Sequence, residues 1–153
     1  MGLDMYLSKR TYVKNWDHMK PEQKHKISID GPSAKAIKPK RISYITEEVM
    51  YWRKSNQIHQ WFVDNVQNGE DDCKEYYVSR DQLQTLLDVV KKVLLFKPSK
   101  EKAAELLPTQ SGFFFGSEDY DEYYWQDLEE TKKGLTELLA EPDIGDFHYQ
   151  SSW

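Results

Sequence analysis

The sequence predicts an α+β fold: an antiparallel sheet of four or five strands with three main helices packed mostly on one face. Three observations lead to this class. The N-terminus alternates apolar and polar residues, as a half-buried strand does. Two later stretches carry apolar residues at helical spacing, and the tail, residues 141–153, can return as one more strand. The 153 residues contain no internal repeat and no Gly/Ser linker, so we expect a single domain over residues 1–153.

The first part of the chain, residues 1–45, is predicted to be a basic meander of strands. Leu3, Met5 and Leu7 alternate with polar residues and share one face of the first strand. A Gly-Pro-Ser turn separates the next two apolar stretches, and Pro39 places the last strand at an edge or a bulge. The predicted elements are a strand at 2–14, a loop at 15–25, a strand at 26–30 (KISID) and a strand at 35–45 (KAIKPKRISYI).

The second part, residues 46–140, is predicted to be mainly helical. Thr46 can cap a first helix that ends at Asn68-Gly69, and Ser79 forms a capping box with Gln82 at the start of the next. The predicted elements are a helix at 46–66, a helix from Ser79 to the KPSK stretch at 97–100, a helical turn at 101–107, a short GFFFG strand at 112–116 and a helix at 117–140. The core face of the second helix is Leu83, Leu86, Leu87, Val90 and Leu94.

Charge is unevenly distributed along the chain. The net charge of −5 divides into +6 over residues 1–45 and −11 over residues 46–153. Residues 118–130 hold seven carboxylates and no basic side chain, which disfavours contact with a phosphate backbone and suits a basic protein surface. We therefore expect no nucleic-acid partner.

Composition excludes several further classes. No apolar run approaches the roughly 20 residues that span a bilayer, and the N-terminus has no signal-peptide pattern, so we expect no membrane association and a cytoplasmic protein. Cys73 is the only cysteine, which excludes an internal disulfide and a cysteine-rich zinc site. The carboxylates at 70–75 do not have EF-hand spacing, and P-loop and GxGxxG motifs are absent. We expect no metal and no cofactor.

Two polar residues interrupt the apolar stripe of the predicted helix at 46–66. Asn56 and His59 are three residues apart and lie on one helix face. Each is either a hydrogen-bonded core residue or part of a wet pocket, because a buried polar group without a partner is costly. Cys73 paired with His59 would be the only nucleophilic arrangement, so no catalytic residues are assigned and an enzyme is the third reading.

The stretch LLPTQSGFFFGS suggests where a ligand could bind. Two glycines bracket three phenylalanines, and neutral hydrogen-bonding side chains precede them, a composition that suits a pocket for a planar ring. The alternative is that the phenylalanines only form a core strand. The predicted ligand-binding residues are Trp52, Arg53, Asn56, His59, Tyr77, Thr109, Gln110, Ser111, Gly112, Phe114, Gly116, Tyr120 and Tyr123.

Three stretches also carry a resemblance: MGLDMYL, YWRKSNQIHQWFVDNVQNGEDDCKEYYVS and LLPTQSGFFFGSEDYDEYYWQDLEET. With them the chain resembles a family of small phage- and prophage-encoded proteins of unknown function, over residues 1–8 and 44–131. The resemblance implies a phage accessory protein in the host bacterial cytosol that acts against host defence. Its partner would be a nucleotide-like small molecule, which it sequesters, or a host defence protein, which it inhibits through the acidic aromatic helix. The oligomeric state, including a homo-oligomer, is left open.

Overall fold

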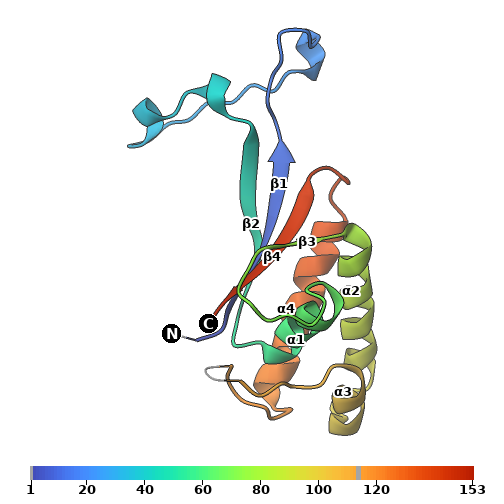
Figure 1. The fold of residues 1–153 in the computed structure, drawn as a ribbon. Coiled ribbons are helices and arrows are strands. Elements are labelled where there is room, and N and C mark those ends of the chain that lie inside the picture. The colour runs from blue at the N-terminus through green and yellow to red at the C-terminus, as the bar shows by residue number, and fades with distance from the viewer. Residues whose placement is uncertain (1, 113–114) are drawn as a thin grey trace.

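The computed structural model describes residues 2–112 and 115–153, and within them four strands form one antiparallel sheet (Figure 1). The strands are β1 (Asp4–Tyr12), β2 (Tyr44–Arg53), β3 (Tyr76–Val78) and β4 (Asp146–Ser152). Their order across the sheet is β2-β1-β4-β3, so the C-terminal strand lies in the middle. The structure confirms the predicted α+β class, the first strand and the strand in the tail.

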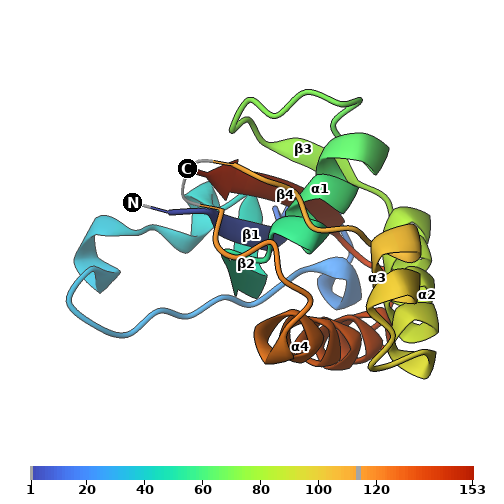
Figure 2. The same cartoon turned by 90° about the horizontal axis from the view of Figure 1, so that it is seen from below.

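Four helices of the described residues gather on one face of this sheet (Figure 2). They are α1 (Asn56–Asn65), α2 (Arg80–Leu95), α3 (Lys100–Leu106) and α4 (Glu122–Leu139). The capping box predicted for α2 is present: Ser79 Oγ accepts from the Gln82 N–H at 3.1 Å, and the Ser79 N–H donates to Gln82 Oε1 at 2.9 Å. None of the described helices has the length and apolar character that crossing a membrane requires.

The core lies between the sheet and the helices. Strand alternation turns Met5 and Leu7 of β1, and Leu3 just before it, toward the helices, and all three are fully buried. From the neighbouring strand Tyr149 joins them, and its ring stacks on Phe62 of α1 with centroids 3.8 Å apart. This stacking fixes α1 over the middle of the sheet.

The helix predicted at 46–66 is wrong over its first half. Residues 44–53 form β2, which pairs antiparallel with β1, and the helix begins only after Ser55. The β-branched and aromatic residues of this stretch suit a strand, and pairing with β1 outweighs the helix-favouring Glu47 and Glu48. The register of the β1–β2 pairing also shifts at a bulge between Leu7 and Ser8, so the residues of β2 do not alternate regularly between the two faces.

The strands predicted at 26–30 and 35–45 are also wrong, except for the start of β2. Residues 14–42, all of them described, pair with no strand and form an arm beyond one end of the sheet (Figure 1). A bond from the Val13 N–H to the Ser43 carbonyl, 2.9 Å long, closes the base of the arm. Residues 26–30 have no regular structure, and 3-10 turns at Ala34–Ala36 and Pro39–Arg41 replace most of the second predicted strand; Pro39 cannot donate to a sheet.

The last long helix starts later than predicted. Its N-cap is Asp121, whose Oδ1 accepts from the N–H groups of Tyr123 and Tyr124, so the helix begins at Glu122 and not at 117. The described residues in front of it, 107–112 and 115–121, form no helix or strand, Gly112, Phe115 and Gly116 included, and we call them the 107–121 loop. The remaining part of the predicted GFFFG strand lies outside the described residues. β3 is an element that the sequence did not predict.

Truncation of Leu87 to Ala tests the assignment of the α2 core face. Leu87 is 3% exposed, so the substitution should lower the free energy of unfolding by about 2 to 5 kcal/mol through lost transfer energy and a cavity. Chemical denaturation measures the loss. The matched control is Leu95→Ala on the same helix, where the side chain is 83% exposed, and its effect should stay within about 0.5 kcal/mol. Equal losses in both variants would contradict the packing.

Candidate functional site

The side chain of Asn56 holds the 107–121 loop against the start of α1. Its Nδ2 donates to the carbonyls of Phe115, at 3.1 Å, and Ser117, at 2.9 Å, and its Oδ1 accepts from the Gln110 N–H at 2.9 Å. Asn56 is 1% exposed. Both ends of the amide are therefore used by loop backbone, which explains a polar residue at this buried position.

Three further contacts fix the shape of this loop. The Tyr124 hydroxyl donates to the Leu107 carbonyl at 2.7 Å, and burial raises the pKa of this tyrosine. Thr109 donates from its hydroxyl to the Glu118 carbonyl at 2.8 Å. Gly116 has φ of +89°, and a Cβ at this position would lie 3.0 Å from the Cβ of Lys54. The loop therefore approaches the end of β2 as closely as only glycine allows.

Between this loop, the β2–α1 junction and the first turns of α4 lies a cleft of about 250 Å³. We call it the cleft. Its lining combines two cations, three carboxylates, two tyrosines and neutral polar groups. The lining residues are Arg53, Lys54, Gln57, Thr109, Gly116, Ser117, Asp119, Asp121, Tyr123, Tyr124 and Asp127.

Asp127 is the carboxyl in the cleft whose ionisation is most altered. Desolvation by burial raises the pKa of Asp127 to about 6, while the neighbouring polar side chains of Gln57 and Ser55 oppose the rise. The Gln57 contact is long, with Nε2 3.4 Å from Oδ2. Ser55 Oγ is fully buried and makes no hydrogen bond of good geometry within the described residues. A carboxyl that titrates near neutral pH at the wall of a cleft is typical of a functional site.

The cations of the cleft come from the end of β2, and its exposed ring and the Asp127 carboxyl come from α4. Arg53 is exposed at the end of β2, and Lys54 follows it with φ of 55°. Tyr123 is 68% exposed and precedes Asp127 by one helical turn, so both side chains lie on the same face of α4. The cleft can therefore offer a ring surface, hydrogen-bond acceptors and positive charge to one small molecule.

His59 lies in the core and not in the lining of the cleft. The ring is fully buried, with Nδ1 2.6 Å from the Tyr149 hydroxyl and Nε2 3.0 Å from Asp71 Oδ2. The second contact has ion-pair distance but not the alignment of a hydrogen bond. Asp71 also accepts from the indole of Trp153 at 3.0 Å, and the edge of Phe115 packs on the imidazole. His59 thus joins α1 to β4 and to the 107–121 loop.

The other predicted residues are dispersed. Trp52 is buried and donates from its indole to Thr131 at 2.8 Å, whereas Tyr77 is 58% exposed on the face of the sheet without helices. Tyr120 accepts from the Thr109 N–H in the loop. Ser111 and Gly112 are exposed, and Phe114 lies outside the described residues. Of the predicted residues, the cleft brings together Arg53, Thr109, Gly116 and Tyr123.

Sequence reasoning did not select seven residues of the cleft. They are Lys54, Gln57, Ser117, Asp119, Asp121, Tyr124 and Asp127. The i, i+4 spacing of Tyr123 and Asp127 at the start of a long helix was visible in the sequence, but the burial that alters Asp127 was not. Gln57 was missed because the predicted helix at 46–66 placed it off the inward face that holds Asn56 and His59.

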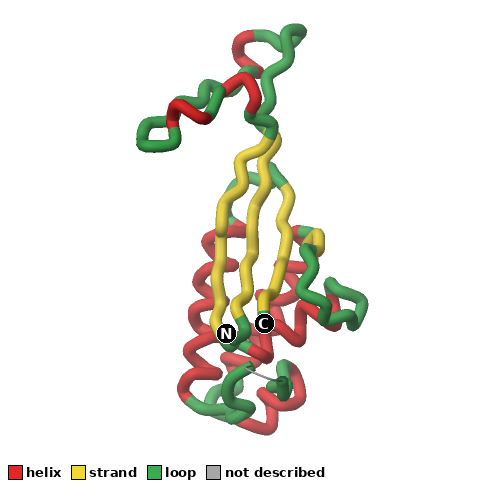
Figure 3. Tube along the Cα trace, turned by 60° about the vertical axis from the view of Figure 1, so that its left-hand side comes forward, coloured by secondary structure: helices red, strands yellow, loops and turns green. Residues whose placement is uncertain are grey.

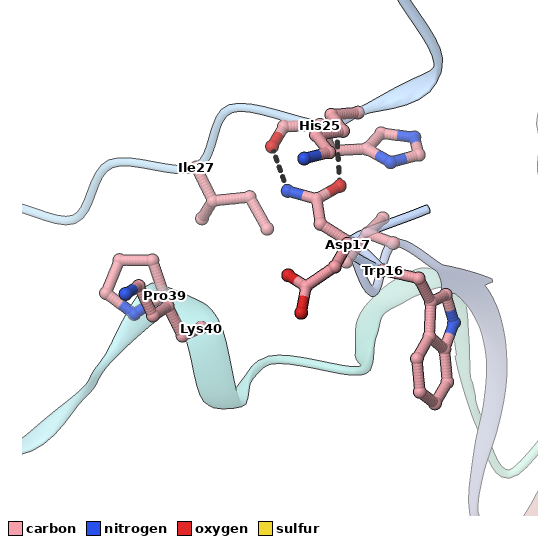
Figure 4. Close-up of a pocket in the computed structure, with 9 residues that line it drawn as sticks. Trp16, Asp17, His25, Ile27, Pro39 and Lys40 are labelled. Atoms are coloured by element: carbon pink, nitrogen blue, oxygen red, sulfur yellow. Dashed lines mark hydrogen bonds between the residues drawn. The ribbon is translucent and has the colours of Figure 1, made fainter. Parts of the chain in front are cut away.

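A larger cavity, of about 410 Å³, lies within the arm (Figure 4). The Asn15 side chain closes it by bonding both backbone groups of His25, at 2.7 and 2.8 Å. Its lining residues are Val13, Asn15, Trp16, Asp17, Lys24, His25, Ile27, Pro39 and Lys40. These side chains are mostly exposed, and none of the polar ones is buried. The cleft is the better candidate, because its polar groups are partly desolvated and converge on one space.

Neither a metal site nor a similar protein indicates what the cleft binds. In the described part of the chain, no group of three or more His, Cys, Asp or Glu side chains could hold a metal ion. No family model matches the chain, and no match is found among curated proteins or solved structures. The geometry of the cleft is therefore the basis for a functional assignment.

Substitution of Asp127 by Asn tests the ionisation of this carboxyl. Because the folded protein raises the pKa from 3.8 to about 6, the wild type loses stability as pH rises through this range, and the neutral amide does not. Asp127→Asn should therefore increase the free energy of unfolding above pH 6, by on the order of 1 kcal/mol after allowance for solvent screening. The increase should disappear near pH 4. Asp88→Asn, on the exposed face of α2, should show no such pH dependence.

Substitution of Asn56 by Ala tests the loop contact. The variant leaves two carbonyls and the Gln110 N–H without their partner, so it should cost about 1 to 3 kcal/mol in denaturation. Hydrogen exchange at the Gln110 amide should accelerate, because Asn56 Oδ1 is its acceptor. Asn65→Ala, which removes a single bond to the Trp61 carbonyl at the end of α1, is the control. Unchanged exchange at Gln110 would contradict the contact.

Proposed function

We propose that this protein binds a small planar ligand of nucleotide type in the cleft. The observation that carries the proposal is the partly buried Asp127 carboxyl, with its raised pKa, in one cavity with Arg53, Lys54 and the exposed Tyr123 ring. Such a combination is typical of sites that recognise a ring by stacking and by its hydrogen-bonding edge. It is a binding site and needs no chemical step.

The charges of the cleft suggest how the ligand lies. Asp127 is a hydrogen-bond acceptor, so it suits the amino or imino edge of a base. Tyr123, one turn away, offers its ring face for stacking, and the cations at the end of β2 suit a phosphate. The base end therefore lies along α4 and the anionic end beside Arg53 and Lys54.

The size of the cleft limits what it holds. A volume of about 250 Å³ is slightly below the range of about 300 to 1,000 Å³ for sites that enclose drug-sized ligands. One base, with part of its sugar, fits such a space. The phosphate groups would stay at the mouth, where solvent and the exposed Arg53 surround them.

The resemblance to small phage and prophage proteins gives the proposal a biological setting. In that setting the protein is an anti-defence accessory factor of the host bacterial cytosol, and it sequesters a nucleotide signal. A rigid cleft that binds without turnover suits sequestration. The fixed backbone around Asn56 provides this rigidity.

A second candidate function is inhibition of a host defence protein through the start of α4. The observation that favours it is the exposure of Tyr123 among the carboxylates of Glu118, Asp119 and Glu122. An exposed aromatic ring with acidic neighbours suits a basic protein surface. The first candidate would be favoured if the protein binds a nucleotide and the nucleotide displaces no bound protein partner.

Calorimetric titration with nucleoside monophosphates and cyclic dinucleotides tests the proposal. We expect saturable binding that strengthens as pH rises through about 6, because the acceptor is ionised Asp127. Tyr123→Ala and Asp127→Asn should each weaken binding by about tenfold or more, corresponding to a lost stacking contact or hydrogen bond.

The control for this experiment is Tyr77→Ala. Tyr77 is a similarly exposed tyrosine on the face of the sheet without helices, so its loss should leave the affinity unchanged. Equal losses in the Tyr77 and Tyr123 variants, or no binding across the panel, would reject the cleft as a nucleotide site.

A further inference from the structure

No helix covers the sheet face opposite α1 to α4 (Figure 3). Its side chains are rich in tyrosine. Strand alternation and register place five tyrosines and His148 on it, and they meet in three cross-strand pairs. The pairs are Tyr6 with Tyr51 at 5.4 Å, Tyr12 with Tyr44 at 5.1 Å and Tyr77 with His148 at 6.0 Å between ring centroids. Four of these tyrosines are 45% to 58% exposed. We call this surface the tyrosine face.

The arm extends from one end of the tyrosine face. It bends toward the side of the sheet that carries no helices, as the two perpendicular views agree (Figures 1 and 2). Residues 14–42 contain eight Lys or Arg and three Asp or Glu, a surplus of +5. Trp16, Ile29 and Ile37 of the arm are 36% to 45% exposed. The arm thus presents positive charge and partly exposed apolar side chains.

The opposite end of the sheet is acidic. There the 107–121 loop leads into α4, and residues 118–122 carry four carboxylates and no cation (Figure 1). Glu118, Asp119 and Glu122 are exposed. We call residues 118–122 the acidic end. One molecule therefore carries a basic arm at one end of the sheet and, at the other end, a cluster of carboxylates that adjoins Arg53 and Lys54.

We propose that the tyrosine face is the interface between two copies of this chain, related by a two-fold axis that sets their strands antiparallel. This symmetry reverses the ends, so the arm of each copy meets the acidic end of the other. The contact is isologous and closed, because each copy supplies one arm and one acidic end. The tyrosines form its centre, in keeping with the enrichment of this residue at protein interfaces.

The charges on the tyrosine face favour a second copy over a nucleic acid. Asp4, Glu48 and Asp146 lie there together with Arg10 and Arg53, as the strand register requires. Carboxylates among the tyrosines would repel a phosphate backbone, whereas mixed charges can match their own symmetry mates. The tyrosine pairs lie outside the cleft, whereas Arg53, Asp119 and Asp121 line the cleft as well. Dimerisation is measured without a ligand, so the proposal does not depend on ligand binding.

Sedimentation velocity of the full chain tests the proposal. The wild type should be a dimer at low salt and dissociate at high salt, as the Debye length falls from about 30 Å at 0.01 M to about 3 Å at 1 M. Charge reversal in the arm (K35E/K38E/K40E) or at the acidic end (E118K/D119K/E122K) should each raise the dimer dissociation constant at least about tenfold. The control K91E/K92E/K97E, at the exposed end of α2, should remain dimeric.

Mixing the two reversed variants gives the most specific result. Each is monomeric alone because its arm and acidic end have the same sign. In the mixture each arm meets an acidic end of opposite charge, so an equimolar heterodimer should form. A docking surface for an unrelated partner would show no such rescue.

A second set of variants tests the tyrosine face without changing charge. Y44S/Y77S should weaken the dimer with an unchanged circular dichroism spectrum, because both side chains are exposed. A wild type that stays monomeric at low salt, a dimer that resists both charge reversals, or a mixture that stays monomeric would each overturn the proposal. A monomer that binds an oligothymidylate in fluorescence anisotropy would assign the face to single-stranded nucleic acid instead.

Discussion

The shape of the cleft depends on the hydrogen bonds of the Asn56 side-chain amide. A primary amide can donate twice and accept, and here it does so to three backbone groups of a segment that has no regular secondary structure of its own. Without this residue the loop would lose the partners for its polar backbone, and the wall of the cleft would have no fixed position. A single buried side chain thus takes the place that a strand pairing would have in a more regular fold.

The ionisation of Asp127 in the cleft depends on the position of this loop. Gly116 lies against Lys54 only because the loop is held down, and this close approach closes the space above Gln57 and Asp127. Water is partly excluded from the carboxyl, which raises its pKa. The chain therefore places Asp127 where a hydrogen-bond donor from a ligand would replace lost hydration. Carboxyl groups with altered ionisation of this kind are common at functional sites.

Local patterns in the sequence predicted the parts of the fold that local interactions determine. The capping box of Ser79 and Gln82 depends on four consecutive residues, so α2 could be predicted closely. β2 could not, because its residues become a strand by pairing with β1, some forty positions earlier. Thr109 was selected as a neutral hydrogen-bonding residue ahead of the GFFFG stretch, Tyr123 as an aromatic ring for stacking, and Arg53 as a cation beside an aromatic residue. Asp127 was missed because its burial is a property of packing that periodicity does not encode.

The order of the strands has a consequence for how the molecule folds. β4 lies between β1 and β3, so the β1–β2 pair and the short β3 become one sheet only when β4 inserts. The β1–β4 pairing joins Asp4–Arg10 to Asp146–Ser152 and so closes a loop that contains nearly all of the described chain. Contacts between residues so far apart in sequence carry a large entropic barrier. We expect insertion of β4, and not formation of the helices, to limit the folding rate, and an intermediate without β4 would leave the β1 edge open to other chains.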